Sequence, residues 1–190
     1  MNEQIESYNF FSSFFFNLTD RSFVEKVLSY DFGDDDVAGV ALIKEYVRRA
    51  GSRDIEEVRT EIAVDRTYLL HGVTPEGGPR PPYESLYVGD AQEIAALSIN
   101  RFYRQNGFKV QEGVGQPPDY IGIELAFMEL LLKEGEATFE TQKDFFNKHL
   151  SKWGTLYADE MIKFARTDFW RGIGHLLKSF LEEEAEVYSQ

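Results

Sequence analysis

The chain has 190 residues, enough for one domain with a sizeable core, and its apolar share of 43 % argues against global disorder. It contains no cysteine, which excludes disulfides and thiolate metal sites and is consistent with a reducing cytoplasm. Acidic residues outnumber basic residues by 33 to 20, so the net charge of −13 favours basic partners and disfavours nucleic acid and anionic lipid.

Apolar residues recur every three or four positions from residue 11 to residue 102, which is the spacing of amphipathic helices. Acidic side chains at residues 34–36, Asp54 and Asp90 are placed to cap three of these helices, and Gly51 and Gly107 are placed to end two. The residues expected to face inward are, helix by helix, Phe11, Phe14, Phe15 and Leu18; Phe23, Val27 and Leu28; Val40, Ile43 and Val47; Ile55, Val58, Ile62 and Leu69; and Ile94, Leu97 and Phe102.

The helical pattern is stronger after residue 137. Thr138 precedes an aromatic-rich helix, and a further run of inward residues follows at a spacing of four, with a bend expected near Gly154. These inward residues are Phe139, Phe145, Phe146, Trp153, Tyr157, Met161, Ala165, Phe169, Leu176, Leu177 and Phe180. No run shows the alternation of a strand, so the sequence predicts an all-α fold, a single compact multi-helix bundle over residues 1–190.

Two long breaks interrupt the helices. They are His71 to Ser85 and Phe108 to Pro118, and both are rich in Pro and Gly. Loops of this length in a helical domain are often functional, and flexible linkers are the alternative. The N-terminus carries Glu3 and Glu6 where a signal peptide would carry basic residues, and no apolar run reaches transmembrane length, so we expect a soluble cytoplasmic protein.

The helix that follows the second break contains a misplaced carboxylate, Glu124. At about 100° per residue, Gly122, Ala126, Glu129 and Lys133 form one stripe, expected to face solvent, and Glu124 lies on the opposite side. A buried carboxylate needs partners, so Glu124 either accepts hydrogen bonds from a loop backbone or pairs with an Arg, or it faces a groove for a basic or amide-bearing ligand. Asp119 is expected in the first helical turn, where its charge favours the helix dipole.

Three motifs in this sequence resemble those of one family. Residues 116–128, QPPDYIGIELAFM, are similar to the E-P-x-D-H-(I/L)-x-x-E-L-x-F-M signature of the TorD/DmsD family of redox-enzyme maturation chaperones, which is related to NarJ. Leu69-Leu70 with the later PPYESLY, and HLSKW from residue 149, resemble two further family patterns. The likeness runs from residue 65 to residue 184. Gln116 replaces the usual Glu, Tyr120 the usual His, and Leu70 an aromatic residue.

The resemblance implies a cytoplasmic all-helical chaperone. Such a protein binds the twin-arginine leader of a molybdopterin oxidoreductase, or the apoenzyme itself, assists cofactor insertion and delays export until maturation. A leader has a basic head and an apolar stretch, so its receptor needs carboxylates and an aromatic trough. The residues implied for peptide binding are Leu69, Leu70, Tyr83, Glu84, Tyr87, Gln116, Pro118, Asp119, Tyr120 and Glu124.

An enzyme is the first alternative, and we expect no catalytic activity. Asp119 and Glu124 are five residues apart on the expected helix, so their side chains diverge by roughly 140°. His71, His149 and His175 lack metal-binding spacing, and the latter two are expected to be structural.

Two further alternatives are a nucleotide-binding protein and a helical interaction scaffold without a peptide client. Gly77-Gly78 and Gly113 to Gly115 are not followed by the Lys-Ser/Thr of a P-loop, so turn glycines are favoured. We expect no cofactor, although the resemblance leaves weak GTP binding open. The protein is expected to be a monomer or a dimer.

Overall fold

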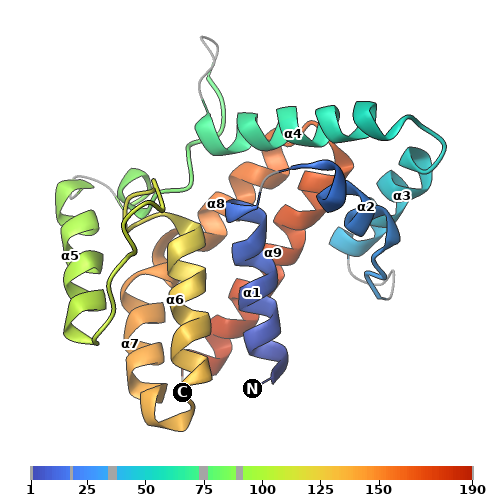
Figure 1. Cartoon of the computed structure of the whole chain (residues 1–190). Coiled ribbons are helices and arrows are strands. Elements are labelled where there is room, and N and C mark those ends of the chain that lie inside the picture. Colours follow the sequence, from blue (N-terminus) through green and yellow to red (C-terminus); the bar gives the residue numbers. More distant parts are fainter. Residues whose placement is uncertain (1, 18, 34–37, 73–76, 89–91, 190) are drawn as a thin grey trace. The chain divides into compact units, whose positions relative to one another are not determined.

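The computed structural model describes every residue except 1, 18, 34–37, 73–76, 89–91 and 190. The described residues form helices with no β-strand, which confirms the predicted all-α class (Figure 1). One isolated antiparallel bridge joins Tyr83 and Tyr120. The helices are α1 Asn2–Phe16, α2 Arg21–Ser29, α3 Ala38–Ala50, α4 Ile55–His71, η1 Glu84–Leu86, α5 Gln92–Gln105, α6 Ile121–Lys133, η2 Glu136–Thr138, α7 Phe139–Lys148, α8 Leu150–Phe164 and α9 Asp168–Tyr188.

The chain groups into two compact units. Unit 1 comprises Met1–Phe16, Pro82–Thr155 and Phe180–Gln190, and unit 2 comprises Asn17–Pro81 and Leu156–Ser179. Helices α8 and α9 contribute residues to both units. The single domain expected over residues 1–190 stays a prediction.

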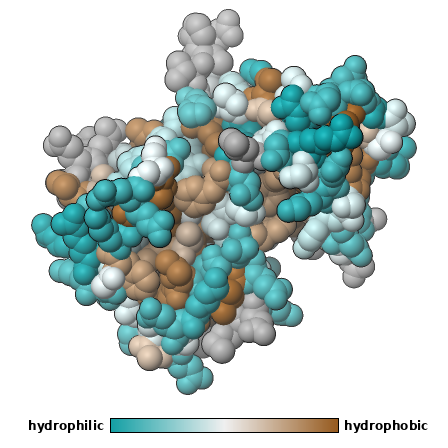
Figure 2. Space-filling model, in the orientation of Figure 1, coloured by the Kyte–Doolittle hydropathy of each residue, from teal (hydrophilic) through white to brown (hydrophobic). Residues whose placement is uncertain are grey.

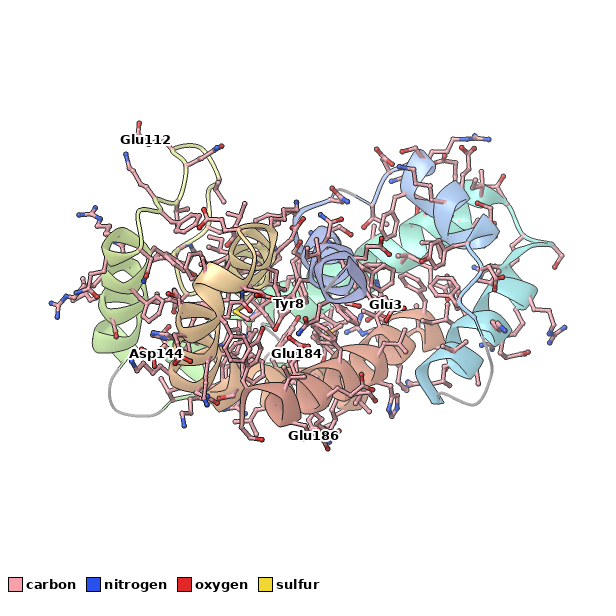
Figure 3. The ribbon with its side chains drawn as sticks, turned by 90° about the horizontal axis from the view of Figure 1, so that it is seen from below. Glu3, Tyr8, Glu112, Asp144, Glu184 and Glu186 are labelled. Atoms are coloured by element: carbon pink, nitrogen blue, oxygen red, sulfur yellow. The ribbon has the colours of Figure 1, made fainter. Side chains whose placement is uncertain are left out.

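Unit 1 is built around α6, which packs mainly on α1 and also on α7. Gly122 permits the close approach of α1, because a Cβ at this position would lie 3.0 Å from Cβ of Phe15 and 3.1 Å from the Phe16 ring. The first half of α1 meets the end of α9, where the Tyr8 hydroxyl donates to Glu184 at 2.7 Å (Figure 3). Helices α1 and α6, which are distant in sequence, therefore pack against each other.

The expected solvent stripe on α6 is wrong for two of its four residues. Gly122 is buried against α1, and Glu129 is only 7 % exposed. Asn9 of α1 donates to Glu129 at 3.0 Å, and Lys133 donates to the same oxygen at 2.5 Å. The solvent-exposed stripe of α6 is narrower than predicted, because α1 packs against part of the side that was expected to face solvent.

Unit 2 contains α2, α3, α4 and the adjoining parts of α8 and α9. Helices α3 and α9 approach closely at two glycines: a Cβ on Gly39 would lie 2.6 Å from the carbonyl oxygen of Gly172. Asp54 caps α4 as predicted and accepts from the amides of Glu56 and Glu57 at 2.9 and 3.2 Å. The two glycines thus allow α3 and α9 to approach closely, and the acidic cap defines the start of α4.

The bend predicted near Gly154 lies elsewhere. Helix α8 continues through Gly154 to Phe164, and the chain breaks at residues 165–167 before α9 begins. The carboxylate of Asp65 accepts from the amide of Arg166 at 3.0 Å, and from the amide and hydroxyl of Thr167 at 2.7 Å each. The break is therefore stabilised by an acid from α4, about a hundred residues earlier in the chain.

Most of the expected inward residues are buried or half-buried, with two exceptions. Leu97 is 66 % exposed, and its helix instead buries Ile99 and Tyr103, so the inward face of α5 was assigned wrongly. Phe139, at the start of α7, is 40 % exposed. Leu18, residues 34–36, Asp90 and the Ile94 side chain lie outside the described residues.

Candidate functional site

The Pro-rich end of the first break is fastened to the turn that precedes α6. The amide of Glu84 donates to the carbonyl of Asp119 at 2.9 Å, and the amide of Ile121 donates to the carbonyl of Pro82 at 3.0 Å. The Asp119 carboxylate accepts from the amide of Ser85 at 3.2 Å. Because α6 begins only at Ile121, Asp119 does not lie in its first turn as predicted, and it satisfies an amide of η1 instead.

Three tyrosine hydroxyls hold the same region in place. Tyr83 donates to the side-chain oxygen of Gln116 at 3.0 Å, and Tyr103 donates to the carbonyl of Pro118 at 3.1 Å. Tyr120 is buried and donates to the carbonyl of Phe15 at the end of α1, at 2.9 Å. The polar end of each ring is therefore satisfied within unit 1.

Glu84 and His149 form a buried pair in unit 1. Nδ1 of His149 lies 3.0 and 3.1 Å from the two carboxylate oxygens of Glu84, and both side chains are almost fully buried. The histidine is thus structural, as predicted, and it offsets part of the desolvation cost of the acid. The pair joins η1 to the connection between α7 and α8.

Glu124 is fully buried, as its helical position predicted. Its Oε2 accepts from the indole of Trp153 at 3.2 Å, while Oε1 has no hydrogen-bond partner among the described residues. Burial raises the pKa of this carboxyl well above its usual range, and the negative charges of Glu84 and Asp119 raise the pKa further. The arrangement favours a neutral carboxylic acid at this position.

The ten residues implied for peptide binding differ widely in exposure. Glu84, Asp119, Tyr120 and Glu124 are buried and bonded within unit 1. Tyr83, Tyr87, Gln116 and Pro118 are half-buried around them. Leu69 and Leu70 are buried on α4 and belong to unit 2. The structure thus brings eight of the ten residues together in unit 1. The role of all ten residues in peptide binding stays a prediction.

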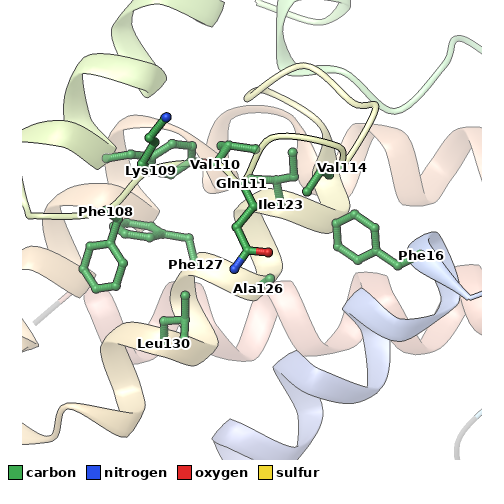
Figure 4. A pocket seen from close by; sticks show the side chains of 11 residues that line it. Phe16, Phe108, Lys109, Val110, Gln111, Val114, Ile123, Ala126, Phe127 and Leu130 are labelled. Carbon is green, nitrogen blue, oxygen red and sulfur yellow. The ribbon is translucent and has the colours of Figure 1, made fainter.

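An apolar cavity of about 160 Å³ lies beside this cluster, within unit 1. It is enclosed by the end of α1, one side of α6 and the loop between α5 and α6 (Figure 4). Three of its lining residues are large apolar side chains with substantial exposure: Phe16 at 40 %, Val114 at 37 % and Leu130 at 45 %. Apolar side chains also reach the surface around α6 in the face drawn in Figure 2. Such exposed apolar surface marks a binding site more often than chance.

The sequence reasoning missed this cavity, although it contained a signal. The loop between α5 and α6 was selected for its length and glycines, yet it also carries Phe108, Val110 and Val114, which line the cavity. The same loop carries Lys109 and Glu112, which pair at 3.1 Å with side chains 67 % and 92 % exposed. Glu112 extends from the loop into solvent (Figure 3). An exposed pair of this kind contributes little to stability and exchanges partners readily.

The described part of the chain lacks two features, a metal-binding cluster and a membrane-spanning helix. No group of three or more His, Asp or Glu side chains has the arrangement needed to hold a metal ion. No helix there combines the length and the apolar character needed to cross a bilayer.

Comparison with known proteins gives one consistent result. The family described as nitrate reductase delta subunit matches residues 33–159 of this chain. Curated relatives named chaperone protein TorD include those of Vibrio parahaemolyticus, 24 % identical over 140 residues, Photobacterium profundum, 28 % over 142 residues, and Vibrio cholerae, 22 % over 143 residues. The matches cover 67, 68 and 70 % of this chain and 64, 65 and 64 % of the respective relatives, so the chain spans about two-thirds of their length or slightly less.

Proposed function

This chain belongs to the nitrate reductase delta subunit family, which contains the TorD-like maturation chaperones, and from that membership we propose that it is a chaperone for a redox enzyme. Its client is the apo form of a molybdopterin oxidoreductase, the twin-arginine leader of that enzyme, or both. The chaperone assists cofactor insertion in the cytoplasm and delays export until the client is mature. The proposed role is binding rather than catalysis.

The structural observation that supports binding of a leader is the apolar cavity of unit 1. A leader contains an apolar stretch, and a site for such a stretch needs exposed apolar side chains on a stable base. Phe16, Val114 and Leu130 provide the exposed surface, and the buried part of α6 provides the base. We therefore assign the apolar stretch of the leader to this cavity.

The basic head of the leader requires carboxylates near the cavity. Glu112 meets this requirement, because it lies on the lining loop, is 92 % exposed and pairs only with exposed Lys109 among the ion pairs found in the described residues. An arginine can displace Lys109 and bind Glu112 through two parallel hydrogen bonds, which a lysine cannot do. The net charge of −13 adds a long-range attraction that salt screens.

The buried acids act on the peptide indirectly in this proposal. Glu84 and Asp119 fasten η1 to its surroundings, and η1 follows directly after Tyr83, which is half-buried. Glu124 accepts from Trp153 on α8. Gln116 is half-buried and bonded to Tyr83. Loss of the buried acids would therefore alter the surface beside the cavity without removing a direct contact between the protein and the peptide.

The test is calorimetric titration of the protein with the twin-arginine leader encoded beside its gene. Leu130→Asp places a charge in the cavity and is expected to weaken binding at least tenfold, which corresponds to about 1.4 kcal/mol. Leu97→Asp is the matched control, because Leu97 is 66 % exposed and does not line the cavity. Equal losses in the two variants, or no heat with any neighbouring leader, would contradict the assignment.

A second experiment separates charge from geometry. Replacing both leader arginines by lysine keeps the charge and is expected to weaken binding to the unmodified protein. The difference between the two peptides should shrink in Glu112→Gln, where no carboxylate remains for the bidentate pair. Identical affinity of both peptides for the unmodified protein would remove Glu112 from the site and leave the apolar assignment to stand on the first experiment.

A further inference from the structure

Unit 2 contains a polar cavity that the chaperone proposal does not use. Its volume is about 260 Å³, and it is lined by Tyr46, Arg49, Arg53, Glu61, Arg166, Thr167 and Asp168. Three arginines and two acids leave an excess of one positive charge among the lining side chains. This excess is notable because the whole chain has a net charge of −13.

The three guanidinium groups are oriented by different partners. Arg49 contacts Asp168, and Arg53 donates to Glu61 at 2.6 Å. The guanidinium carbon of Arg166 lies 3.9 Å from the centre of the Tyr68 ring, and it makes no ion pair among those found in the described residues. An arginine has five N–H donors, so each group keeps donors for a further acceptor. The stacked Arg166 has the most of them.

One wall of the cavity is the connection between α8 and α9. The carboxylate of Asp65, which is 1 % exposed, accepts hydrogen bonds from the amides of Arg166 and Thr167 and from the Thr167 hydroxyl. The Thr167 hydroxyl in turn accepts from the amide of Trp170 in the first turn of α9. The backbone that carries Arg166 is therefore held in position before any ligand arrives, which lowers the entropy cost of binding.

We propose that this cavity binds an oxyanion, either a phosphate group or a small polycarboxylate. Guanidinium groups bind both through paired hydrogen bonds, and three of them around one cavity match an ion with several acceptor oxygens. A water molecule occupies about 30 Å³ in the liquid, so 260 Å³ accommodates an ion together with part of the molecule that bears it. The positive end of the α9 dipole adds to the attraction without being needed for it.

The experiment measures the shift in melting temperature produced by inorganic phosphate and, separately, by malonate, with ionic strength held constant by sodium chloride. A ligand that binds only the folded state raises the melting temperature by an amount that grows with the logarithm of its free concentration once that concentration exceeds Kd. If phosphate alone raises the melting temperature, the cavity is a phosphate site, and if malonate alone raises it, the cavity is a polycarboxylate site. If both ions raise it, the cavity accepts both classes of oxyanion. No shift with either ion overturns the proposal.

The variants locate the effect. Arg166→Gln removes an exposed guanidinium and is expected to weaken the affinity for the stabilising ion about tenfold or more, the loss expected for one hydrogen bond to a charged group. Arg104→Gln is the matched control, since Arg104 is an exposed arginine on α5 in unit 1. The proposal predicts that Arg104→Gln behaves like the unmodified protein. Equal weakening in both variants, or none in Arg166→Gln, would show that the ion does not act through this cavity.

Discussion

Replacing Glu124 by Gln should change how stability depends on pH. The substitution removes the ionisable group, preserves its size and keeps an oxygen to accept from Trp153. Burial, then the charges of Glu84 and Asp119, raise the pKa of Glu124 in the folded protein above the usual 4.5. The folded state therefore binds more protons than the unfolded state above that pH, and the free energy of unfolding falls as pH rises.

The size of this pH dependence is set by the single proton that the Glu124 carboxyl retains in the folded state. The free energy of unfolding of the unmodified protein should fall, relative to that of Glu124→Gln, by up to about 1.4 kcal/mol per pH unit. Over the two units from pH 5 to pH 7 this amounts to up to about 2.7 kcal/mol. The free energy of unfolding falls with urea concentration with a slope of about 2 kcal/mol per M. The gap between the urea midpoints of the unmodified protein and Glu124→Gln should therefore change by about 1–2 M between pH 5 and pH 7.

The assay is urea unfolding at pH 5, 6 and 7, followed by tryptophan fluorescence, to which Trp153 beside Glu124 contributes. Glu112→Gln makes the same chemical change at a position that is 92 % exposed, and it reports the effect of lost surface charge. A difference between the unmodified protein and Glu124→Gln that stays constant with pH would refute the reasoning, because the carboxyl would then not be held neutral by its surroundings.

Three further substitutions test the packing of unit 1, each by urea unfolding at fixed pH. Glu129→Ala leaves Asn9 without its acceptor and should cost about 1–3 kcal/mol; a cost below about 0.5 kcal/mol would return Glu129 to the solvent face. Gly122→Ala forces a Cβ into contacts of 2.9–3.1 Å with α1 and its own preceding turn and should cost about 1–3 kcal/mol, whereas no loss would mean that α1 moves freely. His149→Phe leaves the Glu84 carboxylate buried without its partner and should cost about 3–5 kcal/mol; a neutral result would show that Glu84 finds another donor.

The fold class and much of the helix pattern could be read from the sequence because helix formation depends on neighbours three and four residues apart. Asp54 illustrates this, since a cap bonds to amides two and three residues ahead. The burial of Glu124 was predictable for the same reason, because its immediate helical neighbours are apolar. The three sequence motifs also led to the correct family, since their order along the chain needs no coordinates.

The faces that helices turn toward one another were decided by tertiary structure. Glu129 has the sequence context of a surface residue, and only the arrival of α1, 120 residues earlier in the chain, buries it. The partner of Glu84 lies 65 residues away, and the acid that holds the break between α8 and α9 lies about a hundred residues away. The apolar cavity similarly needs Phe16 beside residues 108–130. Periodicity records which side of one helix is apolar, whereas the identity of the covering element depends on how all helices together exclude water, and that choice is not encoded in any local run of residues.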